Sequence, residues 1–291
     1  MLPDMQLKLF NSIVSPIWYY GAEVWGLHKA EQIDKMHISF LKSILCVKVA
    51  TPNCFVYGEL GVYPLRIERQ IRVVKYWLKV ISTCLTNDNY VGKVYMELLE
   101  LSREKPNITT WCTQVRDLLC SSGFGYVWAN QRMYDGKEFM CIFRQRLYDI
   151  YLQEWNANVS LTSENRLYRS IKYTFKYEQY LNINNRSLRI ALTRIRLSSH
   201  LFMIERGRWG KNRLHVNDRK CSLCGVLENE FHSIMVCPRF NNEREGCLAK
   251  LSIVEPNNYE FVNLFRNKDE EVILNLAILC YKIQKEYRQF V

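Results

Sequence analysis

Proline and glycine are scarce in this sequence, which holds 7 Pro and 12 Gly among its 291 residues. Folds made of many short β-strands need turn residues at short, regular intervals. This scarcity therefore disfavours such folds and favours long helices. The sequence also lacks an apolar run of about 18 residues, the length that a membrane-spanning helix needs. The longest candidate, 272–281, is shorter and contains Asn275. We therefore expect no membrane partner.

The first residues, Met1-Leu2-Pro3-Asp4, lack the positive charge and the small-residue cleavage site of a secretory signal. We expect an intracellular, reducing location, either the nucleus or the cytoplasm. The 11 cysteines are an odd number, which does not suit a closed disulfide framework. Seven of them stand alone in apolar, helix-like stretches and are predicted to be small buried hydrophobes. These seven are Cys46, Cys54, Cys84, Cys112, Cys120, Cys141 and Cys280.

Apolar residues recur at helical spacing in two long segments, which predicts a mainly α fold. The first stripe consists of Ile71, Val74, Leu78, Ile81 and Leu85. The second consists of Val272, Leu276, Leu279, Ile283 and Tyr287. Thr51-Pro52 predicts a helix start with Thr as the cap, and Pro64 predicts another. Breaks are predicted at 87–89, 105–107 and 182–185, where Asn, Asp or Pro cluster.

The chain is strongly basic, with 40 Lys+Arg against 29 Asp+Glu and a net charge of +11. The excess is concentrated in 160–215, where twelve Lys or Arg face three Glu, a local charge of +9. Polyanions are the default partners of such a segment, and nucleic acid is the first of them.

Four metal-binding residue types follow this basic segment in the order Cys-x2-Cys-x7-His-x4-Cys, formed by Cys221, Cys224, His232 and Cys237. Zinc takes four nitrogen or sulfur ligands in a tetrahedron, and two Cys separated by two residues can bind one ion from a tight turn. Gly225 follows this pair, where the turn needs a residue that tolerates positive φ. We predict one structural Zn²⁺, because four protein ligands leave no open coordination position.

Three other interpretations remain open. Cys247 could replace one of the ligands, although it lies ten residues beyond the last Cys. The four residues could instead be buried thiols and a surface His. A Cys-x-x-Cys redox pair is a poorer alternative, because no βαβ pattern surrounds it.

Cations and planar side chains close to this cluster are the residues that nucleic acid requires, for phosphate neutralisation and base stacking. Trp209 is the stacking candidate, whereas Phe231 is predicted to pack in the core. The nominated nucleic-acid-binding residues are Arg194, Arg196, Arg206, Arg208, Trp209, Lys211, Arg213, Arg219 and Lys220.

Several blocks of the sequence resemble the C-terminal part of non-LTR (LINE-like) retrotransposon polyproteins. Near the zinc motif these blocks are RLSSHL (196–201), IERGR (204–208) and the Cys-x2-Cys-x7-His-x4-Cys-Pro run with Glu230 before the His. Nearer the N-terminus they are SPIWYYGAEVWG (15–26), FLKSIL (40–45) and ELGVYPL (59–65), which resemble the end of the reverse transcriptase of these elements. The resemblance implies a thumb-like helical region over 1–86, a helical connector over 87–185 matched by position alone, and a basic CCHC zinc-knuckle region over 186–291.

The polymerase signature of that family is missing from this chain. Its catalytic Tyr-x-Asp-Asp motif supplies two adjacent carboxylates for two Mg²⁺ ions, and this sequence contains no adjacent Asp pair. We therefore expect no enzyme activity and no catalytic residues. The resemblance implies binding of RNA or DNA by a non-catalytic, zinc-containing protein. The alternative is a helical protein–protein interaction module, or a remnant of such an element without retained activity.

Overall fold

The computed structural model describes residues 1–84, 90–105, 107–132, 135–162, 166–209, 213–251, 253 and 255–289. Most of these residues are helical, and no β-strand occurs in the described ranges, which confirms the mainly α prediction. None of the helices in these ranges is both long enough and apolar enough to cross a membrane. The predicted break at 87–89 lies outside the described residues.

The chain divides into two compact units, each built from segments that are distant in the sequence. Unit 1 comprises Met1–Lys8, Ile38–Val62 and Ala157–Val291, and unit 2 comprises Leu9–His37 and Tyr63–Asn156. The regions 1–86, 87–185 and 186–291 do not coincide with these units. Composition shifts mark the ends of helices, whereas a compact unit is defined by the helices that bury their apolar faces together.

Unit 2 contains the long helix α6 (Leu65–Cys84), which packs against α3, α7 and α8. Val73, Val74 and Trp77 of α6 are fully buried. The Trp77 indole N–H donates to the Tyr95 hydroxyl at 3.0 Å, and its ring stacks on Trp128 with centroids 5.7 Å apart. The other elements of unit 2 are η1 (Phe10–Val14), α2 (Ser15–Trp18), α3 (Ala22–Trp25), the first part of α4 (Glu31–Leu45), α7 (Tyr90–Glu104), α8 (Trp111–Ser121), α9 (Gly125–Asn130) and most of α10 (Gly136–Leu161).

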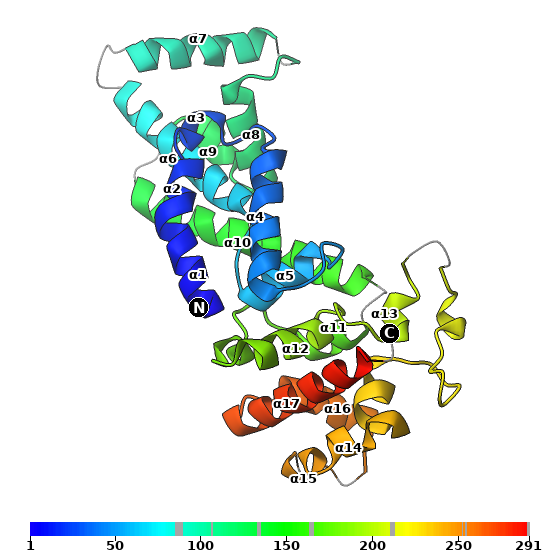
Figure 1. Cartoon of the computed structure of the whole chain (residues 1–291). Helices are drawn as coiled ribbons and strands as arrows, with labels where there is room; N and C mark the ends of the chain where they lie inside the picture. Colours follow the sequence, from blue (N-terminus) through cyan, green and yellow to red (C-terminus); the bar gives the residue numbers. More distant parts are fainter. Residues whose placement is uncertain are drawn as a thin grey trace. The chain divides into compact units, whose positions relative to one another are not determined.

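Unit 1 contains the C-terminal half of the chain, and α12 (Arg186–Arg196) runs alongside α17 (Glu270–Tyr287) within it (Figure 1). Leu192 and Ile195 of α12 and Leu279 and Ile283 of α17 are buried, as the second stripe predicts. The other elements are α1 (Pro3–Leu9), the end of α4, α5 (Asn53–Leu60), α11 (Arg166–Ile171), η2 (Gln179–Asn182), α13 (Met203–Arg206), η3 (Val216–Asp218), η4 (His232–Val236), η5 (Pro238–Phe240), α14 (Asn241–Arg244), α15 (Cys247–Lys250) and α16 (Asn258–Arg266).

Local capping signals explain where several helices begin. Asn185 caps α12 through the backbone N–H groups of residues 187 and 188, and Asp269 caps α17 through those of residues 271 and 272. The helix α6 begins directly after Pro64, as predicted. A helix, α5, also begins after Thr51-Pro52, at residue 53, but the assignment of Thr51 as its cap is wrong, because Pro52 occupies the capping position and no side chain caps the helix.

Gly61 ends α5 in the left-handed conformation, with φ of +61°. A Cβ atom at this position would lie 2.5 Å from the backbone nitrogen of Tyr177, so no other residue fits without a shift of the backbone. Residues 59–61 thus pack against residues 176–178, the segment that precedes η2.

The prediction for single cysteines is confirmed for Cys112 and Cys280, which are buried. It is wrong for Cys120 and Cys141, which are exposed on α8 and α10. Apolar neighbours in the sequence do not reveal which face of the helix a given residue occupies, because adjacent residues point in different directions.

Burial of His37 predicts a pH-dependent stability of unit 2. Its imidazole stacks on Phe10 with centroids 5.4 Å apart, and burial lowers its pKa from 6.5 to about 4. As the pH falls, His37 is therefore protonated in the unfolded chain at a higher pH than in the folded protein. We expect stability to be complete above pH 6.5 and to fall by about 3 kcal/mol between pH 6.5 and 4.

Urea denaturation of wild type and His37→Leu across this pH range measures the effect. The difference in unfolding free energy between the two proteins should change with pH, because other titrating groups cancel in the comparison. A difference that stays constant would contradict this account of His37.

Candidate metal centre

The Cys221–Cys224 turn is held by a short hairpin-like pairing of its two ends. Lys220 and Leu227 form an isolated antiparallel bridge, and the Cys221 backbone N–H donates to the Val226 carbonyl at 2.8 Å. The N–H of Gly225 donates back to the Cys221 carbonyl at 2.9 Å. Gly225 has φ of +70°, which confirms the predicted need for a residue that tolerates this conformation.

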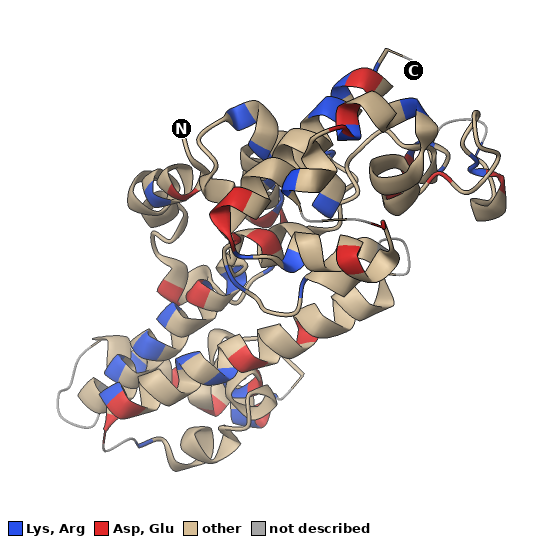
Figure 2. Ribbon diagram, turned by 90° about the horizontal axis from the view of Figure 1, so that it is seen from below, with Lys and Arg blue, Asp and Glu red and all other residues tan. Residues whose placement is uncertain are grey.

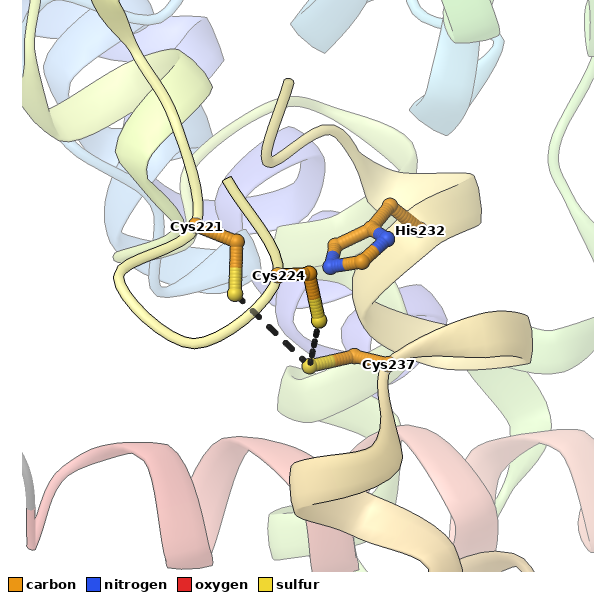
Figure 3. A group of neighbouring side chains, drawn as sticks. All are labelled: Cys221, Cys224, His232 and Cys237. Carbon is orange, nitrogen blue, oxygen red and sulfur yellow. Dashed lines mark hydrogen bonds between the residues drawn. The ribbon is translucent and has the colours of Figure 1, made fainter. Parts of the chain in front are cut away.

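The other two residues are placed by a single π-helical turn, η4. The Cys237 backbone N–H donates to the His232 carbonyl at 2.7 Å, five residues back along the chain. Wider turns of this kind bring residues five apart onto one side. The His232-x4-Cys237 spacing therefore directs both side chains toward the Cys221–Cys224 turn (Figure 3).

Four possible ligand atoms, one from each residue, lie within 4.8 Å of one another. The Cys237 sulfur lies 3.8 Å from the sulfurs of both Cys221 and Cys224 (Figure 3). Cys221, His232 and Cys237 are buried, and Cys224 is half-buried. The His232 Nε2 atom is buried without a hydrogen-bond partner. A buried nitrogen of this kind is costly unless something binds it, and a group with this composition could hold a metal ion.

The environment disfavours thiolates in the absence of a cation. Burial raises the pKa of Cys237 to about 12 and also raises the pKa of Cys224. Burial lowers the pKa of His232, which keeps its imidazole neutral and able to coordinate. A divalent cation would reverse the effect on the thiols, since its charge stabilises the deprotonated form.

A buried arginine, Arg244, stabilises the loop that carries His232 and Cys237. Arg244, on α14, donates to the carbonyls of Ile234 and Cys237 and to the Asn241 side chain. Arg244 is one of the cations that lie close to the metal-binding motif in the sequence, yet only 5% of its surface is exposed. Phe231 packs edge-on against Phe261 with centroids 5.7 Å apart, and it is half-buried, so the prediction of a core residue is met only in part.

A half-buried glutamate, Glu230, links the loop to residues 198–202. Glu230 accepts hydrogen bonds from His200 Nε2 at 3.0 Å and from the Ser198 hydroxyl at 3.2 Å. The backbone N–H of Phe202 donates to His200 Nδ1, so the ring proton resides on Nε2. This link was not predicted from the sequence, because the separation of 30 residues between His200 and Glu230 does not indicate a contact.

Cys247 lies outside the cluster that the structure describes. It is buried at the start of α15, where the Lys282 Nζ atom approaches its sulfur at 3.9 Å. The alternative in which Cys247 replaces one ligand is therefore not supported by this geometry.

The nominated nucleic-acid-binding residues fall into two groups. Residues of one group are buried or half-buried and bind other groups of the chain. Arg196 is the clearest case: it is 3% exposed, paired with Glu59 and Glu178, and cannot reach a phosphate, so its nomination is wrong. Arg219 is half-buried and donates to the carbonyls of Ile204 and Leu214.

The other group remains accessible. Trp209 is 47% exposed and lies beside the Arg208 guanidinium, which is 5.5 Å from its ring centroid and 2.9 Å from Glu205. Arg206, Arg213 and Lys220 are exposed, and Arg194 is half-buried. Lys211 lies outside the described residues.

The charge of 160–215 is thus less available than its sequence suggests. Lys172, Arg189 and Arg196 are all buried. Along the ribbon, basic and acidic segments lie close to one another in several places (Figure 2).

Comparison with family models, with curated proteins and with solved structures found no match for this chain.

Proposed function

We propose that this chain is a non-catalytic nucleic-acid-binding protein with one structural zinc ion held by Cys221, Cys224, His232 and Cys237. The observation that carries the proposal is the convergence of three sulfurs and a buried, unpartnered imidazole nitrogen. The resemblance to the C-terminal part of non-LTR retrotransposon polyproteins supports the nucleic-acid partner, which could be RNA or DNA.

The geometry favours zinc among the possible metals. A tetrahedral zinc with Zn–S bonds of about 2.3 Å holds its sulfurs about 3.8 Å apart. The two measured separations from Cys237 are 3.8 Å. Thiolates with one imidazole are soft ligands that suit zinc better than Mg²⁺ or Ca²⁺. With four protein ligands the ion would stabilise the fold without activating water.

Exposed cations and an exposed aromatic close to the metal-binding motif in the sequence support nucleic acid as the partner. Trp209 presents an accessible ring for base stacking, and Arg206, Arg213 and Lys220 are available for phosphates. Lys220 directly precedes Cys221, and Arg206, Trp209 and Arg213 lie before it in the sequence.

Binding of single-stranded nucleic acid should weaken steeply with salt, because each phosphate contact releases a condensed counterion. We expect log K to fall with log salt at a slope of about −0.7 for each phosphate contacted on a single strand. Trp209→Ala should weaken binding by about 1–3 kcal/mol without changing this slope. Fluorescence anisotropy at several KCl concentrations measures both quantities.

Tyr259→Ala offers a matched control, because it removes another exposed aromatic ring from unit 1. It should leave binding unchanged. If the metal-containing protein bound neither RNA nor DNA at low salt, the alternative of a protein–protein interaction module would be favoured instead.

A further inference from the structure

A second feature of unit 1 is a pocket of about 260 Å³ that is separate from the metal centre. It is formed where residues 46–48, after α4, meet the end of α12, the segment 199–202 and the last turn of α17. We name it the Lys48 pocket. Its lining residues are Cys46, Val47, Lys48, Arg194, Ser199, His200, Leu201, Phe202, Gln284, Tyr287 and Arg288.

Three cations line the Lys48 pocket, and no Asp or Glu lines it. Lys48, Arg194 and Arg288 come from three different segments, and none of them forms an ion pair within the described residues. Burial lowers the pKa of Arg194, and repulsion from Arg288 lowers it further. Like charges gathered in a partly desolvated pocket are destabilising unless an anion neutralises them.

The positions of two of these cations are fixed by backbone contacts. The Lys48 ammonium donates to the His200 carbonyl at 2.7 Å, and the Lys48 backbone N–H donates to the Ser199 hydroxyl at 2.8 Å. Arg194 donates from Nε to the Cys46 carbonyl at 3.2 Å. Because Nε is used in this way, the two Nη groups of Arg194 are left to bind a ligand.

The three carboxylates that contact or act on lining residues do not line the pocket themselves. Glu230 accepts from His200 and Ser198, and Glu228 accepts from the Tyr287 hydroxyl and the Met203 backbone N–H. Glu205 is paired with Arg208, although its charge also acts on Lys48. These contacts engage the three carboxylates. The Lys48 pocket itself is lined by Lys48, Arg194 and Arg288 and by no Asp or Glu.

We propose that the Lys48 pocket binds a phosphate group of a nucleic-acid strand, an inference that rests on the proposed nucleic-acid-binding function. The volume is just below the range of about 300–1,000 Å³ that is typical of small-molecule sites. It therefore suits one phosphate with its ordered waters better than a whole nucleotide. A planar guanidinium, a second arginine and an ammonium are the groups that proteins use to bind phosphate.

The pocket is also connected to the metal loop. Ser199 and His200 line it, and the Glu230 hydrogen bonds to His200 and Ser198 hold this segment against the loop that carries His232. Zinc in the neighbouring loop would thereby order one wall of the phosphate site.

Arg288→Gln tests the pocket in the full-length, metal-containing protein. Arg288 is exposed near the end of α17, so the variant should fold. Lys285→Gln is the matched control, because it removes one exposed positive charge from the same helix outside the pocket. With a labelled single-stranded RNA, we expect Arg288→Gln to bind about tenfold more weakly and to lower the salt slope by about 0.7. The control should change affinity by less than about twofold.

Inorganic phosphate distinguishes the possible sources of the phosphate group. At matched ionic strength it should raise the melting temperature of wild type but not that of Arg288→Gln. Equal RNA affinities for Arg288→Gln and Lys285→Gln would overturn the pocket while leaving the proposed function intact. If wild type bound no nucleic acid and yet gained stability from phosphate through Arg288, the assignment to a nucleic-acid strand would be overturned.

Discussion

Replacing Cys224 by serine is expected to release the metal and unfold the loop between residues 221 and 237. A serine hydroxyl does not replace a thiolate as a zinc ligand, and three remaining ligands bind far more weakly. Structural zinc sites contribute about 10–16 kcal/mol of apparent binding free energy, which appears directly as folding free energy. The four ligands join a tight turn to a single π-helical turn, so loss of one ligand separates the two turns.

Elemental analysis and thermal melting measure the outcome. Wild type should contain about one zinc per chain, and Cys224→Ser should contain close to none. The variant should melt at a lower temperature and be cut by proteases within 221–237. Cys120→Ser is the matched control, because it removes an exposed thiol outside the cluster and should retain both zinc and stability. Full zinc content in Cys224→Ser would contradict the assignment of the site.

Removing the charge of Arg196 is expected to produce the second large effect. Arg196 donates to Glu59 at 2.5 Å and to the Phe265 carbonyl at 2.7 Å, and it lies 3.3 Å from Glu178. Glu59 is completely buried. Burial acts to lower the pKa of Arg196, but Glu59 and Glu178 outweigh it and raise that pKa. The guanidinium thus joins α5, α12 and the end of α16.

Arg196→Met should destabilise unit 1 by about 3–5 kcal/mol, because it leaves a buried carboxylate without its partner. The double variant Arg196→Met/Glu59→Leu should recover most of this loss. It removes one charge of each sign, and Glu178 keeps its contact with Lys172. Arg206→Met, at an exposed arginine, should change stability by less than about 0.5 kcal/mol.

Urea denaturation followed by circular dichroism measures these differences. An Arg196→Met variant as stable as wild type would show that the buried charges are not coupled as the distances indicate. A double variant less stable than Arg196→Met would show that Glu59 contributes more than its pairing with Arg196.

Patterns that depend on neighbours along the chain were predictable. The apolar stripe of α6, the start of α6 after Pro64 and the positive φ of Gly225 are all properties of a few consecutive residues. The metal cluster was predictable for the same reason, since its four residues lie within 17 positions and two local turns bring them together. The identity of the ion and of the partner stays a prediction.

Contacts between distant segments were not predictable. Arg196 lies in a strongly basic stretch, so its sequence neighbours suggested a phosphate contact. Its actual partner, Glu59, is 137 residues away. The Lys48 pocket was missed for the same reason, because Lys48, Arg194 and Arg288 belong to three segments that are far apart in the sequence.

The sequence by itself determined the helical class, the start of α6 and the four residues that could hold a metal ion, because backbone hydrogen bonds, helix starts and short turns depend on local chemistry. The tertiary structure alone decided which cations face the interior and which line a surface. Arg196 is buried because two carboxylates and a carbonyl group from other segments converge on it. That convergence arises from the packing of α5, α12 and α16, which no run of consecutive residues encodes.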